Sequence, residues 1–306
     1  MRIASIDIGS NSILLLIAAK DPQGVWRRLE EHTEVARIAE GLDAHGSLQQ
    51  AAIDRAATVL CRFVEQARAQ GVQDILLTGT APFRRAENGT RVAHFLEDLL
   101  GVPLMIASGE EEGALTLRAT LDSFGDFAAM RVLDIGGAST ELMRWQDGQI
   151  QSQSIDVGVV RLLERFVHED PACRTSLEEM QRFIALQLHH SFEKPADNLP
   201  VIGVGGTITS LAALDLGLEV WDPEIVQGYR LKLPNIGTLV ERLWPMSVQE
   251  RCDILRVDPR RADVIGVGAS FLHAICEHLQ ADEIIVSDRG VRWGRVYAWD
   301  EKQHGR

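Results

Sequence analysis

The sequence predicts an α/β fold made of two related domains, each a mixed sheet flanked by helices. The chain has 306 residues, enough for two domains with separate cores. Short apolar runs alternate with segments of helical periodicity. The segment Asp7-Ile-Gly-Ser-Asn-Ser12 returns as Asp134-Ile-Gly-Gly-Ala-Ser139, and such internal similarity indicates duplication. We therefore expect domains at residues 1–122 and 123–306.

The first domain is expected to begin with strands and to continue with alternating helices and strands. Strands are predicted within residues 1–20, around a turn at Asp7–Ser12, and at residues 26–36, 74–78 and 104–107. Helices are predicted from the capping-box pattern Ser47 and Gln50 to Gly71, at residues 91–100, and at residues 114–121. Residues 80–88 are expected to form a polar loop. Glu110, Glu111 and Glu112 precede the last helix, where acids complement the positive end of the helix dipole.

The second domain is expected to repeat this order and to add helices. Strands are predicted at residues 131–134, 140–145, 149–157, 201–204 and 283–287. Helices are predicted at residues 158–168, from a capping box at Thr175 and Glu178 to about Glu193, and at residues 208–216, 235–244, 248–254, 261–279 and 290–299. Gly205-Gly206-Thr207 forms a third glycine-rich turn after a strand.

Charge and cysteine usage exclude several classes of protein. Lys and Arg number 31 and Asp and Glu 44, a net charge of −13, which disfavours binding to nucleic-acid phosphates. The four cysteines are widely spaced, as expected for reduced thiols in the cytoplasm rather than disulfides or a zinc site. The apolar run at residues 13–19 is too short to span a membrane. We expect a cytoplasmic protein that binds neither nucleic acid nor membrane.

The segment from Arg131 to Leu142 combines glycines with acids. A short apolar run ends at Asp134, two glycines and two hydroxyl residues follow, and Glu141 closes the segment. Glycines allow backbone N–H groups to approach phosphate oxygens. The two carboxylates suit a hard divalent cation that sits on phosphate. The segment predicts a metal–phosphate site, the plain alternative being a hairpin with one capping acid.

Taken in order, several segments resemble the exopolyphosphatase/guanosine pentaphosphate phosphohydrolase (Ppx/GppA) family of the actin-like ATPase and sugar-kinase superfamily. They are Asp7–Ser12, Glu40–Asp43, Thr80–Asn88, Ser108–Glu112, Asp134–Leu142, Gly158–Leu162, Gly203–Ser210, Arg261–Asp263 and Ser287–Gly290. The resemblance implies two ribonuclease-H-like domains with the active site in the cleft between them. It also implies hydrolytic removal of a terminal phosphate from a phosphoanhydride chain with Mg²⁺, Mn²⁺ being the alternative metal.

The resemblance also assigns roles to residues. Glu111 matches the catalytic base, with Glu112 as its neighbour, and Asp134 and Glu141 match the metal-binding acids. The phosphate-binding residues would be Gly9, Ser10, Asn11, Ser12, Arg84, Gly136, Gly137, Ala138 and Ser139. Further cleft candidates are Asp7, Gly205, Gly206 and Thr207. The chain departs from the family at Ala138, where a third glycine is usual, and at Pro82 before Arg84, which threatens rate and substrate more than reaction type.

Several substrates and activities stay open at this point. Inorganic polyphosphate is the main expectation, and guanosine pentaphosphate (pppGpp) is the second. Larger family members carry additional C-terminal helical domains that this chain lacks, which favours shorter chains or nucleotides. A sugar or acetate kinase and a non-catalytic nucleotide sensor of the same fold are further alternatives. The resemblance implies a homodimer. Arg260 and Arg261 are interpreted mainly as surface charge, although Arg261 lies in a family segment.

Overall fold

The computed structural model describes residues 1–192, 194–195 and 197–304, and the chain forms two compact units. Unit 1 contains residues 1–122 together with the final segment that begins at Arg289, and unit 2 contains residues 123–288. The division expected from the sequence had placed this final segment in the second domain. The segment joins unit 1 because Trp293, Val296 and Tyr297 pack on one face of the first sheet.

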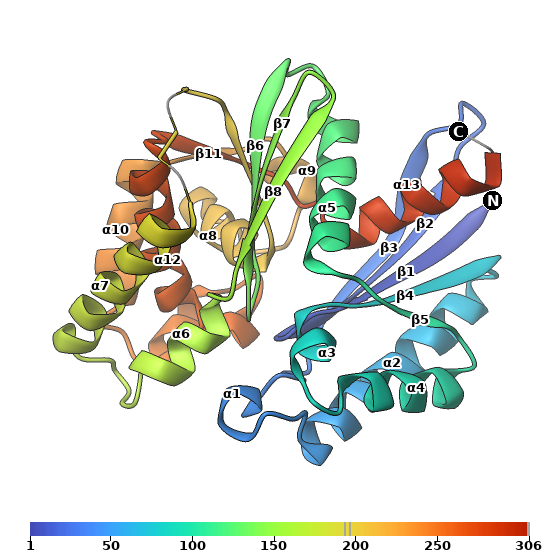
Figure 1. Ribbon diagram of the computed structural model, residues 1–306, viewed down its shortest axis with the longest axis horizontal. Coiled ribbons are helices and arrows are strands. Elements are labelled where there is room, and N and C mark those ends of the chain that lie inside the picture. Colours follow the sequence, from blue (N-terminus) through green and yellow to red (C-terminus); the bar gives the residue numbers. More distant parts are fainter. Residues whose placement is uncertain (193, 196, 305–306) are drawn as a thin grey trace. The chain divides into compact units, whose positions relative to one another are not determined.

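Unit 1 is a five-stranded sheet with helices on both faces (Figure 1). Its strands are β1 (Arg2–Ile8), β2 (Ser12–Lys20), β3 (Trp26–Val35), β4 (Asp74–Gly79) and β5 (Leu104–Ile106). Its helices are α1 (Leu42–His45), α2 (Gln50–Ala69), α3 (Ala81–Arg85), α4 (Gly89–Leu100), α5 (Gly109–Phe124) and α13 (Val291–His304).

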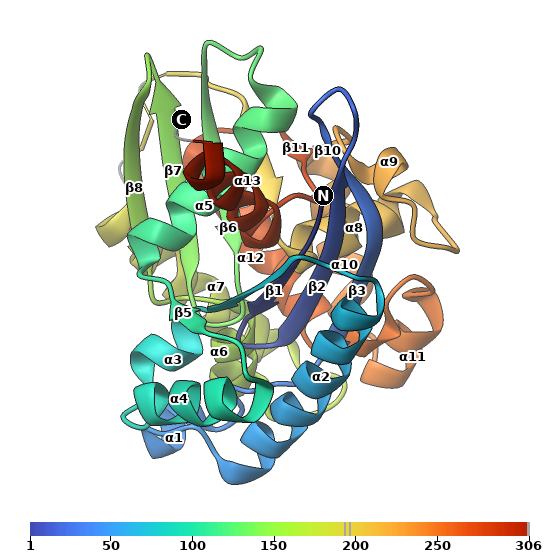
Figure 2. The same cartoon turned by 90° about the vertical axis from the view of Figure 1, so that its right-hand side faces the viewer.

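The first sheet has the order β3-β2-β1-β4-β5. Strands β1, β2 and β3 form an antiparallel meander (Figure 2), and β4 and β5 continue parallel to β1. Side chains alternate along β1: Ala4, Ile6 and Ile8 join the core under α2 and α4, whereas Ile3 joins the core under α13.

Unit 2 repeats this arrangement around a six-stranded sheet. Its strands are β6 (Ala129–Ile135), β7 (Thr140–Gln146), β8 (Gln149–Ile155), β9 (Val201–Val204), β10 (Arg230–Lys232) and β11 (Glu283–Val286). Its helices are α6 (Val159–Phe166), α7 (Arg174–Ser191), α8 (Gly206–Leu216), α9 (Pro223–Val226), α10 (Leu233–Leu243), α11 (Val248–Ile254) and α12 (Ile265–Leu279), with a 3-10 turn at Pro259–Arg261.

The second sheet has the order β10-β11-β9-β6-β7-β8. Without the short edge strand β10, this order matches that of the first sheet, so the duplicated mixed fold expected from the sequence is confirmed. The inner faces of β6, β9 and β11 share one hydrophobic core with α6, α7, α8, α10 and α12. None of the described helices is long and apolar enough to cross a membrane.

The structure corrects several local predictions. Helix α2 begins after Gln49 and α7 after Cys173, and no side chain caps either helix, so the capping boxes expected at Ser47 and Thr175 do not form. Residues 81–85 are helical rather than loop, because proline is tolerated in a first helical turn. The expected end of a helix at Glu193 lies outside the described residues.

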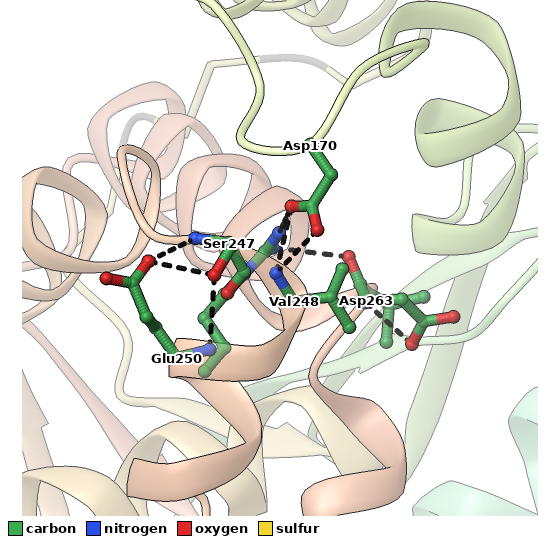
Figure 3. Close-up of polar contacts among 7 residues, drawn as sticks. Asp170, Ser247, Val248, Glu250 and Asp263 are labelled. Atoms are coloured by element: carbon green, nitrogen blue, oxygen red, sulfur yellow. Dashed lines mark hydrogen bonds and ion pairs between the residues drawn. The ribbon is translucent and has the colours of Figure 1, made fainter.

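A buried arginine fixes the chain between α10 and α12 in unit 2. The Asp170 carboxylate accepts a hydrogen bond from the Val248 N–H at the start of α11, and Arg251 lies 3.7 Å from the same carboxylate (Figure 3). Ser247 and Glu250 form a true capping box there. Arg251 also donates to the Asp263 carbonyl at 3.4 Å, which holds the segment that leads into α12.

Candidate functional site

The duplicated sequence pattern builds the same turn twice. In unit 1, the Gly9 N–H donates to the Ser12 carbonyl at 3.0 Å, and in unit 2 the Gly136 N–H donates to the Ser139 carbonyl at 3.0 Å. A Cβ at Gly136 would lie 2.9 Å from the Ser139 oxygen, which explains the glycine. Each turn joins the first two strands, in chain order, of its own sheet, and these two strands are antiparallel. The two halves of the chain therefore carry equivalent glycine turns.

Segments that come later in the chain hold the carbonyl groups of both turns. In the segment after β3, the Arg37 N–H donates to the Asn11 carbonyl and the Ala39 N–H donates to the Ser10 carbonyl. Arg37 has a left-handed backbone, with a φ of 48°. In unit 2, at the start of α6, the Val159 N–H donates to the Gly136 carbonyl and the Val160 N–H donates to the Gly137 carbonyl. With these carbonyls engaged, an anion would meet the turns through their N–H groups.

Ala138 fits its turn without strain. Its φ is not positive, unlike that of Asp147 in the next hairpin, and its side chain is buried. The second turn therefore accommodates alanine at this position without a left-handed backbone.

Gly158 is the point at which α6 approaches the second turn. A Cβ at this residue would lie 2.4 Å from the Gly137 carbonyl carbon and 2.5 Å from the Ala138 nitrogen. Substitution G158A should therefore push α6 away from the turn and lower the free energy of unfolding by about 1–3 kcal/mol, measured by urea denaturation. Substitution G148N is the control, because a Cβ at Gly148 would meet no described atom within 4 Å beyond its chain neighbours and asparagine tolerates its left-handed turn.

Asp134 and Glu141 lie opposite each other in unit 2. They are register partners on β6 and β7, so their side chains leave the sheet on the same face. Glu141 is buried and accepts a hydrogen bond from the Ser154 hydroxyl at 2.9 Å. A Cβ at Gly205 would lie 3.0 Å from the Asp134 Oδ1, so β9 ends against this carboxylate.

These two acids fit a hard cation. Like charges directly opposite each other destabilise a sheet, and a bound cation removes that cost. Carboxylate oxygens are the donors that Mg²⁺ prefers. Within the described residues no group of three or more His, Cys, Asp and Glu side chains could hold a metal. Water and phosphate oxygens would therefore have to complete the coordination of a cation at Asp134 and Glu141.

The third glycine turn leads into α8. Gly205 has a φ of 100°, which only glycine adopts readily. A Cβ at Gly206 would lie 2.0 Å from the Arg261 guanidinium, so Arg261 occupies the space beside this turn. Arg261 is buried, whereas the sequence had suggested surface charge. Burial lowers the pKa of its guanidinium, and the nearby Asp258 opposes this shift.

In unit 1, Glu111 begins α5 in a capping box. The Glu111 carboxylate accepts from the Ser108 N–H at 2.8 Å, and the Ser108 hydroxyl accepts from the Glu111 N–H at 3.1 Å. Glu110 and Glu111 are exposed. Asp7 lies on β1 of the same unit, paired with Leu14 on β2 as Asp134 is paired with Glu141 on β7. The first sheet thus offers one carboxylate where the second offers two.

Arg84 and Glu112 form an ion pair in unit 1. The Arg84 Nη1 donates to Glu112 at 2.7 Å and to the Ala107 carbonyl at 2.7 Å. The side chains are 23% and 13% exposed. Burial raises the pKa of Glu112, and the Arg84 guanidinium opposes the rise. Both hydrogen bonds use the Nη1 nitrogen, so only one side of the planar Arg84 guanidinium contacts Ala107 and Glu112.

Removing this guanidinium should destabilise the protein in a pH-dependent way. R84M leaves Glu112 buried and unpaired, which should cost about 3–5 kcal/mol of unfolding free energy near neutral pH. The pKa of Glu112 then lies further above its usual 4.5. A raised folded-state pKa favours folding below the unfolded value, so R84M should lose stability as pH rises above 4.5.

Urea denaturation of wild type and R84M between about pH 4 and pH 8 measures this effect. Adding E112Q to R84M should restore most of the lost stability. The control is R85M, whose ion pair with Asp43 lies nearer the surface and should be worth about 0–1 kcal/mol. A pH-independent loss in R84M would contradict the assignment.

Comparison with known proteins agrees with these features. The model of the Ppx/GppA phosphatase family matches residues 16–303. The chain belongs to the Ppx/GppA phosphatase family. The resemblance inferred from the sequence motifs is therefore confirmed.

Relatives in this family have different names and lengths. The chain is 29% identical to Exopolyphosphatase 2 of Mycobacterium tuberculosis, covering 95% of this chain and 96% of that protein. It is 30% identical to the guanosine-5'-triphosphate,3'-diphosphate pyrophosphatase of Vibrio parahaemolyticus, covering 96% of this chain but only 58% of that protein. The crystal structure of the Aquifex aeolicus Ppx/GppA family member superposes with a TM-score of 0.83 at 29% identity, covering 99% of this chain and 98% of that one.

Proposed function

We propose that this chain is a hydrolase that releases the terminal phosphate of inorganic polyphosphate. The observation that supports this most directly is the pair of equivalent glycine turns in a member of a phosphatase family. Backbone N–H groups of both turns, Gly9–Ser12 and Gly136–Ser139, would bind phosphate oxygens. Arg84 would use the remaining side of its guanidinium fork for a phosphate oxygen. A phosphoanhydride is already activated, so positioning and neutralisation of charge carry most of the catalysis.

Asp134 and Glu141 would hold Mg²⁺, with Mn²⁺ as the alternative. When bound, the cation neutralises charge on the reacting phosphate. Ser154 orients Glu141 through its hydrogen bond, and the Gly205 backbone limits the space open to Asp134. These contacts keep both carboxylates on one face of the second sheet.

Glu111 would act as the general base for the attacking water. Its exposed carboxylate can accept a proton. The hydrogen bond from the Ser108 N–H fixes one carboxylate oxygen, Oε2, so the orientation of the group is set by the helix start. Glu112, paired with Arg84, would support this geometry rather than accept the proton.

Hydrolysis of pppGpp is the second candidate. The Vibrio parahaemolyticus relative is named for action on guanosine-5'-triphosphate,3'-diphosphate, and the present chain spans little more than half of it. The relative that the chain spans almost completely is named an exopolyphosphatase.

Initial rates of phosphate release test both candidates. The purified protein is given polyphosphates of several lengths and pppGpp, with and without Mg²⁺ or Mn²⁺. We expect metal-dependent release without any acceptor, fastest on polyphosphate. A higher kcat/KM on pppGpp would select the second candidate. ATP consumption that requires a sugar or acetate would indicate a kinase, and binding without turnover would indicate a nucleotide sensor.

A further inference from the structure

Helices α5 and α13 of unit 1 touch through their backbones. A Cβ at Gly294 would lie 2.0 Å from the Leu115 carbonyl oxygen, so glycine permits this contact. Leu115 follows Glu111 by about one helical turn. Arg295 follows Gly294 directly on α13. The contact therefore brings Arg295 to the end of α5 that carries Glu111.

Arg295 is partly buried, and no other group among the described residues uses its polar atoms. Its Nε has no solvent-accessible surface and no hydrogen-bond partner. Within the part of the chain that the structure describes, no hydrogen bond or ion pair involves its guanidinium. Two other arginines near the start of α13 have acidic partners: Arg289 donates to Asp122, and Arg292 pairs with Glu31. An unused buried donor destabilises a protein, so the retention of the Arg295 Nε–H points to an anionic ligand.

Glu111 is the acid whose charge acts on Arg295. Burial lowers the pKa of the Arg295 guanidinium, and the Glu111 carboxylate opposes that shift. Among the described residues the two groups do not form an ion pair. The Glu111 charge therefore acts on Arg295 although the two groups do not satisfy each other's hydrogen-bonding capacity. A carboxylate that accepts a proton and a guanidinium that donates to oxygen suit a water molecule attacking a phosphate.

We propose that Arg295 is a substrate contact that donates hydrogen bonds to the terminal phosphoryl group attacked by water at Glu111. This inference rests on the proposed function. The water oxygen forms the new bond to phosphorus and its proton passes to Glu111. The bond from phosphorus to the bridging oxygen breaks, and its electron pair leaves with the shortened chain. The Arg295 guanidinium matches the spacing of phosphate oxygens and neutralises their charge.

The test is substitution R295M, which keeps an unbranched side chain of similar length and removes the charge. We expect kcat/KM for phosphate release to fall by about 100-fold or more. We also expect Tm to rise, because an unpaired buried charge is replaced by an apolar group. A purely structural arginine would instead lower Tm on removal. R295K should recover part of the rate. R118A is the control, because the Arg118 side chain is 41% exposed and pairs with Glu301 on the same two helices.

The outcomes separate this inference from the proposed function. If wild type releases phosphate and R295M stays within about threefold of its kcat/KM, Arg295 is not a substrate contact. If wild type releases none from polyphosphate or pppGpp, the proposed function fails. Binding of tripolyphosphate, measured by calorimetry, then decides about Arg295 alone. A Kd raised about tenfold or more in R295M supports the contact, and an unchanged Kd overturns it.

Discussion

Substitution E111Q should lower kcat for phosphate release by about 10²–10⁴-fold and leave substrate affinity nearly unchanged. General-base catalysis contributes rate factors of this size, and an amide cannot accept the proton. Glutamine is also accepted at this position of a capping box, so α5 should keep its start at Ser108. The variant thus removes the base without removing the cap.

Steady-state kinetics and tripolyphosphate binding measure the two effects of E111Q separately. S108A is the control, because it breaks the cap, costs about 1 kcal/mol of stability and keeps the carboxylate. We expect S108A to retain turnover at a temperature where it is folded. If E111Q releases phosphate at the wild-type rate, Glu111 is not the base.

Substitution D134N should reduce turnover by about 10³-fold or more and raise the Mg²⁺ concentration needed for half-maximal rate. A bound metal supplies several kcal/mol of charge stabilisation, and a neutral amide binds it more weakly than a carboxylate does. Stability of the metal-free protein should not fall, because the substitution removes a like charge from opposite Glu141.

Magnesium titrations of the rate and thermal denaturation without metal measure these two effects. D147N is the control, since Asp147 lies in the turn between β7 and β8 of the same sheet, is exposed, and has a left-handed backbone that asparagine accepts. A D134N variant with an unchanged requirement for Mg²⁺ would show that the metal is held elsewhere.

The repeated turns could be predicted from the sequence because they depend on neighbouring residues alone. Glycine spacing, the acid before each turn and the apolar runs on either side are all local signals. The repeat also predicted two related mixed sheets, whereas their strand order was visible only in the structure. The membership of α13 in unit 1 could not be predicted, because it depends on Trp293, Val296 and Tyr297 meeting a sheet face formed by residues far earlier in the chain.

The site residues divide in the same way. The pattern that matched Glu111 to a base was visible in the sequence. The capping box that orients Glu111 was not among the predicted capping boxes, although its signal is local because Ser108 and Glu111 are three residues apart. The pairing of Arg84 with Glu112, the burial of Arg261 against Gly206 and the position of Arg295 beside α5 arise from tertiary contacts. The packing of Gly206 and Gly294 carries no signal that a single sequence reveals.

The central claim is that water attacks the terminal phosphorus. Tripolyphosphate hydrolysed by the wild-type protein in ¹⁸O-labelled water tests it most directly. The released orthophosphate should carry one labelled oxygen per molecule, and the pyrophosphate product should carry none. Label in the pyrophosphate, or unlabelled orthophosphate, would contradict attack of water at the terminal phosphorus.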